Sequence, residues 1–170
     1  QIPPWISDSK LTGGFLFEST LHLIDIVSYL FGEAENITAV GTKSVYPCVD
    51  DFSMLFEMKN GCHGVFSSSA HSTWVFPFER VEIYGEHISI FNDEMEAVTY
   101  CLGLNVPVEK RDFSTLPIEE RWGYTQEDQV FVNRILGLDS DNNNLVATHI
   151  EGFKNVEIIE SIYDQIGLDR

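Results

Sequence analysis

Three ionisable side chains near the start of the chain have a spacing that suits proton transfer. Glu18, His22 and Asp25 are separated by four and three residues, so on an α-helix they share one face. The 3.6-residue turn places His22 about 40°, Asp25 about −20° and Tyr29 about 20° around the helix axis from Glu18. In a cleft, His22 could carry a proton while Glu18 orients the imidazole and favours its charged form. Such a pair could take a proton from an alcohol while a hydride leaves elsewhere.

The element that positions these side chains is predicted to be a helix from Leu16 to Phe31, ended by Gly32 as a left-handed stop. Apolar residues occupy most of the remaining circumference, so we expect a helix that is buried on most sides and has a narrow polar stripe. From periodicity alone, a stripe that faces a cleft and a stripe that faces solvent are equally supported.

The middle of the chain has the alternation and turn signals of strands, and the end returns to helical periodicity. Lys59-Asn60-Gly61 separates two β-prone runs and predicts a tight hairpin. A helix is expected over residues 125–136 with Thr125 as its cap, then a polar loop over 139–144 and a helix over 149–166. Strands are expected over residues 36–45, 51–58, 62–70, 78–84, 87–91, 97–102 and 106–113. The predicted fold class is α+β: an open, largely antiparallel sheet of six or seven strands with helices packed on one face.

Composition excludes several classes of protein. The 170 residues include 27 acidic and 10 basic side chains, for a net charge of −17, and 44% are apolar. One domain over residues 1–170 with a real core is expected, and not a disordered acidic tail. The acidity argues against nucleic acid and against an anionic membrane surface, and no apolar run is long enough to span a bilayer. Three cysteines without a Cys-x-x-Cys pair favour a cytoplasmic location.

Motifs for metals and dinucleotides are missing. There is no His-Glu-x-x-His, and the Asp139-x-Asp141-x-Asn143 run has Asn144 and Ile150 where a calcium loop needs Gly and Glu. We therefore expect no metal site. No Gly-x-Gly-x-x-Gly is present. The chain is expected to bind neither NAD nor NADP tightly.

Taken together, the motifs resemble the C-terminal domain of the Gfo/Idh/MocA oxidoreductases. The resemblance rests on Gly13-Gly14 followed by Glu18, His22 and Asp25, and on Trp5 ahead of the glycines. Further similar segments follow in the family's order. These are Asp50-Asp51 before the Asn60-Gly61 hairpin, the run from Glu82 to Ile90 around Gly85, and Phe131 with the last helix.

This resemblance implies a longer, two-domain enzyme. An upstream Rossmann domain, with a Glu-Lys-Pro lysine, would bind NAD or NADP; the start at Gln1 without a Met fits an excised piece. The present domain would bind a sugar, sugar derivative or cyclitol, with His22 as acid/base and Trp5 as a candidate substrate contact. Glu18 would orient His22 or bind a substrate hydroxyl. Asp25 would support the helix or His22, or contact substrate. It would form a homodimer through the open sheet face. The alternative is a non-catalytic ligand-binding or assembly module that kept the same fold.

Overall fold

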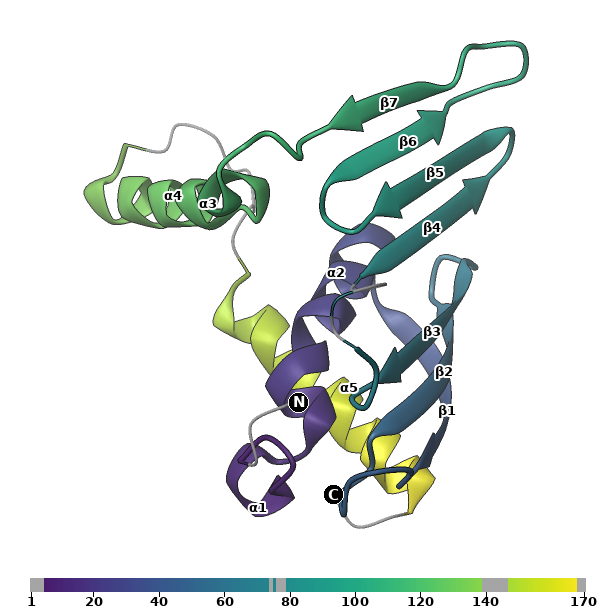
Figure 1. Cartoon of the computed structure of the whole chain (residues 1–170), viewed down its shortest axis with the longest axis vertical. Helices are drawn as coiled ribbons and strands as arrows, with labels where there is room; N and C mark the ends of the chain where they lie inside the picture. Colours follow the sequence, from purple (N-terminus) through teal and green to yellow (C-terminus); the bar gives the residue numbers. More distant parts are fainter. Residues whose placement is uncertain (1–4, 74, 76–78, 139–146, 168–170) are drawn as a thin grey trace. The chain divides into compact units, whose positions relative to one another are not determined.

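The computed structural model describes residues 5–73, 75, 79–138 and 147–167, and divides the chain into two compact units. The first unit comprises residues Gln1–Ser72 and Ala147–Arg170, and the second comprises Thr73–Val146. Both contain an antiparallel sheet together with helices (Figure 1). The predicted α+β class is therefore confirmed. None of the described helices combines the length and the apolarity needed to cross a membrane.

The first unit has a three-stranded antiparallel sheet of order β1-β2-β3, joined by the predicted hairpin. The two long helices α2 and α5 pack against one another, and α5 packs along β1 (Figure 1). Strand β2 alternates between buried and exposed side chains, and its buried set, Phe52, Met54, Phe56 and Met58, forms the centre of the core. The elements are α1 (Ser9–Thr12), a π-helical turn η1 (Leu16–Thr20), α2 (Leu21–Phe31), β1 (Ala34–Thr42), β2 (Asp51–Met58), β3 (His63–Ser69) and α5 (His149–Ile166).

Helix α5 also protects the free edge of this sheet. The side-chain amide of Gln165 donates to the carbonyl of Ile37 at 2.8 Å and accepts from the N–H of Ala39 at 3.1 Å. Unpaired groups on an edge strand are a template for unwanted pairing with other chains. The edge of β1 is therefore closed by a side chain of the helix that packs on it.

The end of α2 is fixed by a charged cluster. Glu33 accepts from Lys154 of α5 and, at 2.6 Å, from Lys59 of the β2–β3 hairpin. These two ammonium groups, Lys154 first, lower the pKa of Glu33 to about 2. Surface ion pairs contribute little stability individually, but this one joins three elements at one point.

The second unit has a four-stranded antiparallel sheet of order β4-β5-β6-β7 and two helices. In its described part, Ala97 is the one buried apolar side chain, and Val81, Ile83, Ile90 and Val98 are only half-buried. The second unit therefore buries little apolar surface on its own. Its elements are β4 (Arg80–Gly85), β5 (Ile88–Asp93), β6 (Ala97–Cys101), β7 (Glu109–Asp112), α3 (Ile118–Arg121) and α4 (Tyr124–Leu136).

All seven predicted strands are present, with ends that differ from the expectation by at most three residues. They form two sheets, where the sequence suggested one. Every ladder joins consecutive strands across a short connection. Residues 70–79 separate β3 from β4 and are too many for a tight hairpin, and no ladder between the two sheets occurs among the described residues. The polar loop predicted over 139–144 lies outside the described residues, as does the Asp139–Asn143 run.

The predicted helix ends were only partly right: Gly32 does end α2, but its φ of 85° and ψ of −157° are not the left-handed helical conformation that was expected. Helix α4 begins after Gly123 without a side-chain cap, so the assignment of Thr125 as a cap was wrong and Thr125 lies inside the helix. Helix α5 begins with a complete capping box, in which the Thr148 hydroxyl accepts from the Glu151 N–H and the Glu151 carboxylate accepts from the Thr148 N–H. This capping box was not among the helix signals expected from the sequence.

Candidate active site

The segment that carries Glu18 and His22 differs from the single α-helix predicted over Leu16–Phe31. Residues Leu16–Thr20 form a π-helical turn, and α2 begins at Leu21. A π-turn closes i→i+5 hydrogen bonds and so inserts one extra residue into the turn. The regular α-helical spacing that was used to place Glu18 and His22 on one face therefore does not hold across this turn. No hydrogen bond or ion pair joins these two described side chains. The assignment of both to acid/base chemistry stays a prediction.

Glu18 is half-buried on this turn and is held from within it. The hydroxyl of Ser19 donates a hydrogen bond to Glu18 Oε2. The next residue, Thr20, is only 2% exposed, and its hydroxyl shares a hydrogen bond of 3.2 Å with the hydroxyl of Ser68 on β3. The π-turn is thus attached to the sheet through Thr20 immediately before α2 begins.

His22 is exposed and lies on an exposed stripe of α2. Ile26 and Tyr29, at i+4 and i+7 from His22, are exposed as well, and Tyr29 is 66% exposed. Ile24 is the one buried residue of α2. The expectation of a helix buried on most sides was therefore wrong, because α2 packs on α5 through one face and leaves apolar and aromatic side chains beside His22 uncovered.

Asp25 is engaged in helix packing. Its Oδ1 accepts a hydrogen bond of 2.5 Å from Nδ2 of Asn155 on α5, and Asn155 Oδ1 accepts one of 3.4 Å from the Ser28 hydroxyl. Asn155 is 3% exposed. A buried amide needs such partners, so this carboxylate fixes the contact between α2 and α5.

The Gly13-Gly14 motif has a steric explanation in the structure. Gly14 has a φ of +106°, and a Cβ at this position would lie 2.3 Å from the hydroxyl oxygen of Tyr163. That hydroxyl accepts a hydrogen bond of 3.2 Å from the N–H of Leu16, the first residue of the π-turn. The first N–H groups of a helix lack partners within the helix. Glycine at position 14 therefore lets a side chain of α5 cap the turn that carries Glu18.

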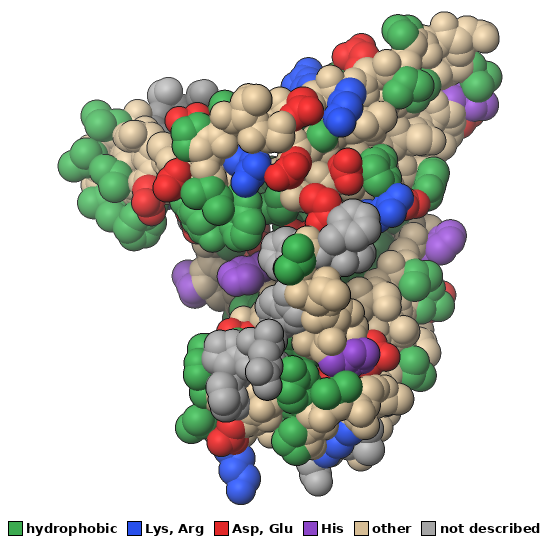
Figure 2. All heavy atoms as spheres, viewed as in Figure 1, with side chains coloured by type: hydrophobic (Ala, Val, Ile, Leu, Met, Phe, Trp, Pro, Cys, Tyr) green, Lys and Arg blue, Asp and Glu red, His purple; other side chains and the backbone are tan. Residues whose placement is uncertain are grey.

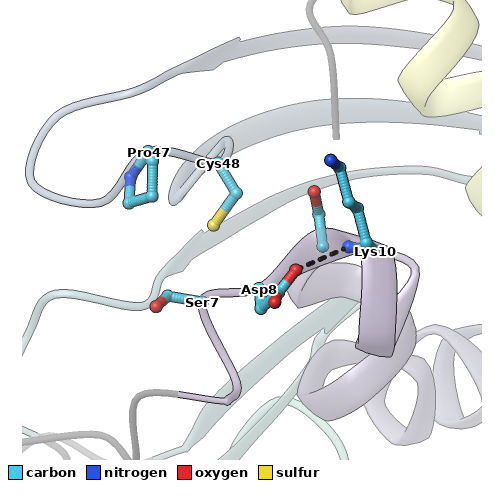
Figure 3. Close-up of a pocket in the computed structure, with 6 residues that line it drawn as sticks. Ser7, Asp8, Lys10, Pro47 and Cys48 are labelled. Atoms are coloured by element: carbon cyan, nitrogen blue, oxygen red, sulfur yellow. Dashed lines mark hydrogen bonds between the residues drawn. The ribbon is translucent and has the colours of Figure 1, made fainter.

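Trp5, the fourth predicted site residue, is 53% exposed. A pocket of about 340 Å³ lies a few residues further along, where Cys48 of the loop before β2 faces Ser7 and Asp8 (Figure 3). Burial raises the pKa of the Cys48 thiol. The residues that line this pocket, Ser7, Asp8, Ser9, Lys10, Pro47 and Cys48, include none of the four predicted site residues.

Asp50 fixes the loop that forms one wall of this pocket. It is fully buried, and its carboxylate accepts from the N–H groups of Ser44, Val45 and Tyr46 at 2.6, 2.7 and 2.9 Å. Burial alone would raise the pKa of Asp50, but these three donors hold the pKa below its usual value. The negative charge of Asp50 is therefore stabilised by backbone N–H dipoles, and the carboxylate holds the loop in its conformation.

Four residues that hold the site in place were not among the predicted site residues: Thr20, Ser68, Asn155 and Tyr163. The best signal was in the last helix, where Asn155, Ile159, Ile162 and Tyr163 share the spacing of one buried face. A polar residue on such a face indicates a buried hydrogen bond. Among the described residues, no group of three or more His, Cys, Asp or Glu side chains is close enough to hold a metal ion.

Comparisons with known proteins agree with this fold. Residues 1–91 match the GFO/IDH/MocA C-terminal domain. The chain is 27% identical to myo-inositol 2-dehydrogenase of Thermotoga maritima over 107 residues, which is 59% of this chain and 32% of that enzyme.

Two solved structures share the fold at low sequence identity. Levoglucosan dehydrogenase, solved with NADH and levoglucosan, has a TM-score of 0.81 at 16% identity, over 96% of this chain and 51% of that one. Aldose–aldose oxidoreductase from Caulobacter crescentus, solved with glycerol, has a TM-score of 0.74 at 18% identity, over 96% and 48%. The chain thus spans about a third of the curated relative and about half of each solved one. Because the family match covers more than half of its residues, the chain belongs to the GFO/IDH/MocA family as a C-terminal domain.

Proposed function

We propose that this chain is the substrate-binding and catalytic C-terminal domain of an NAD(P)-dependent oxidoreductase that acts on a sugar, sugar derivative or cyclitol. The observation that carries the proposal is His22, which is exposed on α2 directly after a π-turn that is attached to both the sheet and α5. A proton-transfer group must be reachable by substrate and held at a fixed position.

The relatives support this substrate class. One is a myo-inositol 2-dehydrogenase, and another was solved with NADH and the sugar derivative levoglucosan. In each reaction of this kind, a hydroxyl loses a proton as its carbon loses a hydride. His22 would take the proton, and the nicotinamide would take the hydride.

The surface around His22 supports a second domain that covers it. Ile26, Tyr29 and Leu30 of α2 are all exposed, which leaves uncovered apolar surface on the C-terminal side of His22 along the helix. An upstream Rossmann domain carrying NAD or NADP would cover this face and exclude water from it. The domain assignment of residues 1–170 as a substrate-binding and dimerisation domain belongs to this proposal.

The other three predicted site residues would have different supporting roles. Glu18 would orient a substrate hydroxyl or the imidazole from the π-turn. Asp25 would support His22 indirectly, since its carboxylate is bonded to Asn155. Trp5 is exposed and available for contact with substrate.

Assembly as a homodimer through the open sheet face is part of the same proposal. On the face of β1–β3 opposite the helices, Val40, Leu55 and Val65 are exposed, and Val65 is 81% exposed. The second unit buries little apolar surface on its own. Exposed apolar surface of this kind marks interaction sites. The cytoplasmic location stays a prediction.

The test uses the complete protein, with whatever segment precedes residue 1 in its gene. It is incubated with NAD or NADP and a panel of aldoses, sugar derivatives and cyclitols, and nicotinamide reduction is followed at 340 nm in the ultraviolet. The proposal expects turnover with at least one member of the panel. Saturable binding of a polyol without reduction of either nicotinamide would favour the non-catalytic module.

A further inference from the structure

We propose that Tyr163 of α5 is a positioning residue for the acid/base face, and that Gly14 is its matched partner. The inference rests on the proposed function for its catalytic consequence, but its structural part is independent of that function. In this role Tyr163 does not act on Glu18 or His22 directly. It acts on the π-turn that separates the glycines from α2.

The first observation is how Tyr163 is held. It is 3% exposed, its ring stacks on Phe17 with centroids 6.1 Å apart, and it meets the edge of Phe52 at 5.9 Å. A buried ring clamped between two aromatic side chains has one available position. Its hydroxyl therefore has a fixed location, which is set by the core of the first unit.

The second observation concerns the groups that surround the Tyr163 hydroxyl. It accepts the Leu16 N–H at 3.2 Å, and it fills the space that a Cβ on residue 14 would need. Leu16 is the first residue of the π-turn. The start of the turn is thus fixed by a residue 147 positions further along the chain, and the end is fixed by the bond between Thr20 and Ser68.

The π-turn determines where Glu18 lies relative to His22. If the π-turn became a regular α-helical turn, the turn would contain one residue fewer. The segment before it would then rotate by about 100° relative to α2. Glu18 would then take a different position relative to His22. A hydroxyl that selects the π-turn thereby selects the relative placement of the two side chains. Insertions of this type occur frequently at functional sites.

A second contact from the same helix acts on the other side of His22. Asn155 and Tyr163 both lie on the buried face of α5, and Asn155 holds Asp25. His22 therefore lies between two residues that are hydrogen-bonded to α5, Leu16 through Tyr163 and Asp25 through Asn155. Helix α5 carries no acid/base group of the proposed reaction and still sets where those groups lie.

The test is amide hydrogen exchange and NMR on the 170-residue chain, with Tyr163→Phe as the variant. Loss of the hydroxyl should speed exchange at Leu16 and across Leu16–Thr20 by at least tenfold more than across β2, and should shift the ring resonances of His22. Ile162→Val is the matched control, because Ile162 is fully buried on the same helix and makes no polar contact through its side chain. It should lower the melting temperature without the selective effect on the π-turn.

Gly14→Ala disturbs the same contact from the other side and provides a second variant. Gly32→Ala is its control, because Gly32 also has a positive φ but has open space around it. Both alanines strain the backbone, and only Gly14→Ala should change exchange in Leu16–Thr20 and the His22 resonances. If Tyr163→Phe and Gly14→Ala give the same exchange pattern as their controls, Tyr163 is only a core residue and the inference is overturned.

Kinetics on the complete protein separates this inference from the proposed function. Tyr163→Phe should lower kcat at least tenfold and leave KM within about twofold, because substrate contacts remain and only the acid/base geometry changes. An inactive wild-type protein would sink the proposed function and leave the exchange result to decide the structural link. An active protein with unchanged kcat in Tyr163→Phe would remove the catalytic part of the inference.

Discussion

Asp50 shows how one buried carboxylate can fix a loop. Its three backbone donors favour the charged form, and the pKa in the folded protein lies below that of the unfolded chain. A group of this kind stabilises the fold at neutral pH, and its contribution disappears as pH falls from the unfolded value of about 4 through the lower folded value.

Asp50→Asn should therefore lower the free energy of unfolding by about 1–3 kcal/mol at pH 7, the usual cost of leaving buried donors without a full acceptor. The difference from wild type should shrink as pH falls below about 4, because Asp50 becomes protonated first in the unfolded chain and, at lower pH, in the folded protein. Urea titrations at several pH values measure both. The matched control is Asp51→Asn, because Asp51 is the next residue and is only half-buried. A deficit that is independent of pH would contradict the account.

At the same scale, the proposed pair predicts unequal and coupled losses of activity. Glu18→Gln keeps the shape of the side chain and removes its charge, so it should reduce turnover of the complete enzyme less than His22→Ala does. The double variant should lose less than the sum of the two free-energy effects, because both act on one proton transfer. Full additivity in a double-mutant cycle would place Glu18 in an independent role.

Single residues were predictable only where the signal was local. Glu18, His22 and Asp25 stand out from their spacing alone. The partners of Asp25 and Leu16, Asn155 and Tyr163, are 130 and 147 residues away. No local pattern can indicate such pairs, and the assignment of Asp25 to substrate contact stays a prediction.

Among the helices, α4 and α5 each have a threonine followed three residues later by an acidic residue near their start, so the capping effect of the two threonines can be compared. Thr125 and Asp128 have the same spacing as Thr148 and Glu151, but only Thr148 caps a helix, since Gly123 starts α4 earlier. Thr148→Ala should lower the free energy of unfolding by about 0.5–2 kcal/mol. Thr125→Ala should leave it within about 0.5 kcal/mol of wild type. Thermal denaturation of both variants checks this, and a larger loss for Thr125→Ala would contradict the structure.

Elements were predictable where periodicity and turn chemistry decide them. The hairpin at Lys59-Asn60-Gly61 and the bounds of α5 follow from short-range signals and are confirmed. The π-turn was not predictable, because it depends on the tertiary contact of Tyr163 with Leu16. The split into two sheets depends on the connection over residues 70–79, and strand patterns alone do not report which strands join across it.

At the scale of the whole molecule, charge and apolar surface oppose one another. A net charge of −17 repels a second copy, whereas the exposed faces of the sheets favour association. Figure 2 shows further apolar side chains gathered over α4, where Phe131, Ile135 and Leu136 are exposed. Because salt screens the repulsion within a Debye length of about 10 Å at 0.1 M, association should tighten as ionic strength rises.

Analytical ultracentrifugation across ionic strengths tests this directly. We expect a dimer whose dissociation constant falls with added salt, and a weaker dimer for Val65→Glu, which puts a charge on the open face of β1–β3. Val45→Glu changes an exposed valine in the loop before β2 and should leave association unchanged. A monomer at every ionic strength would rule out the proposed homodimer.

If His22 moves the proton in the reaction of the complete enzyme, the loss of its imidazole must lower turnover. In the full-length protein, turnover of His22→Ala is compared with that of His63→Ala, which removes an exposed imidazole at the start of β3. The account predicts that His22→Ala lowers kcat by about 10²–10⁴-fold, the range for a lost general acid/base, with cofactor affinity and the activity of His63→Ala unchanged. Intact turnover in His22→Ala, accompanied by a melting temperature several degrees lower, would show instead that His22 is a structural residue.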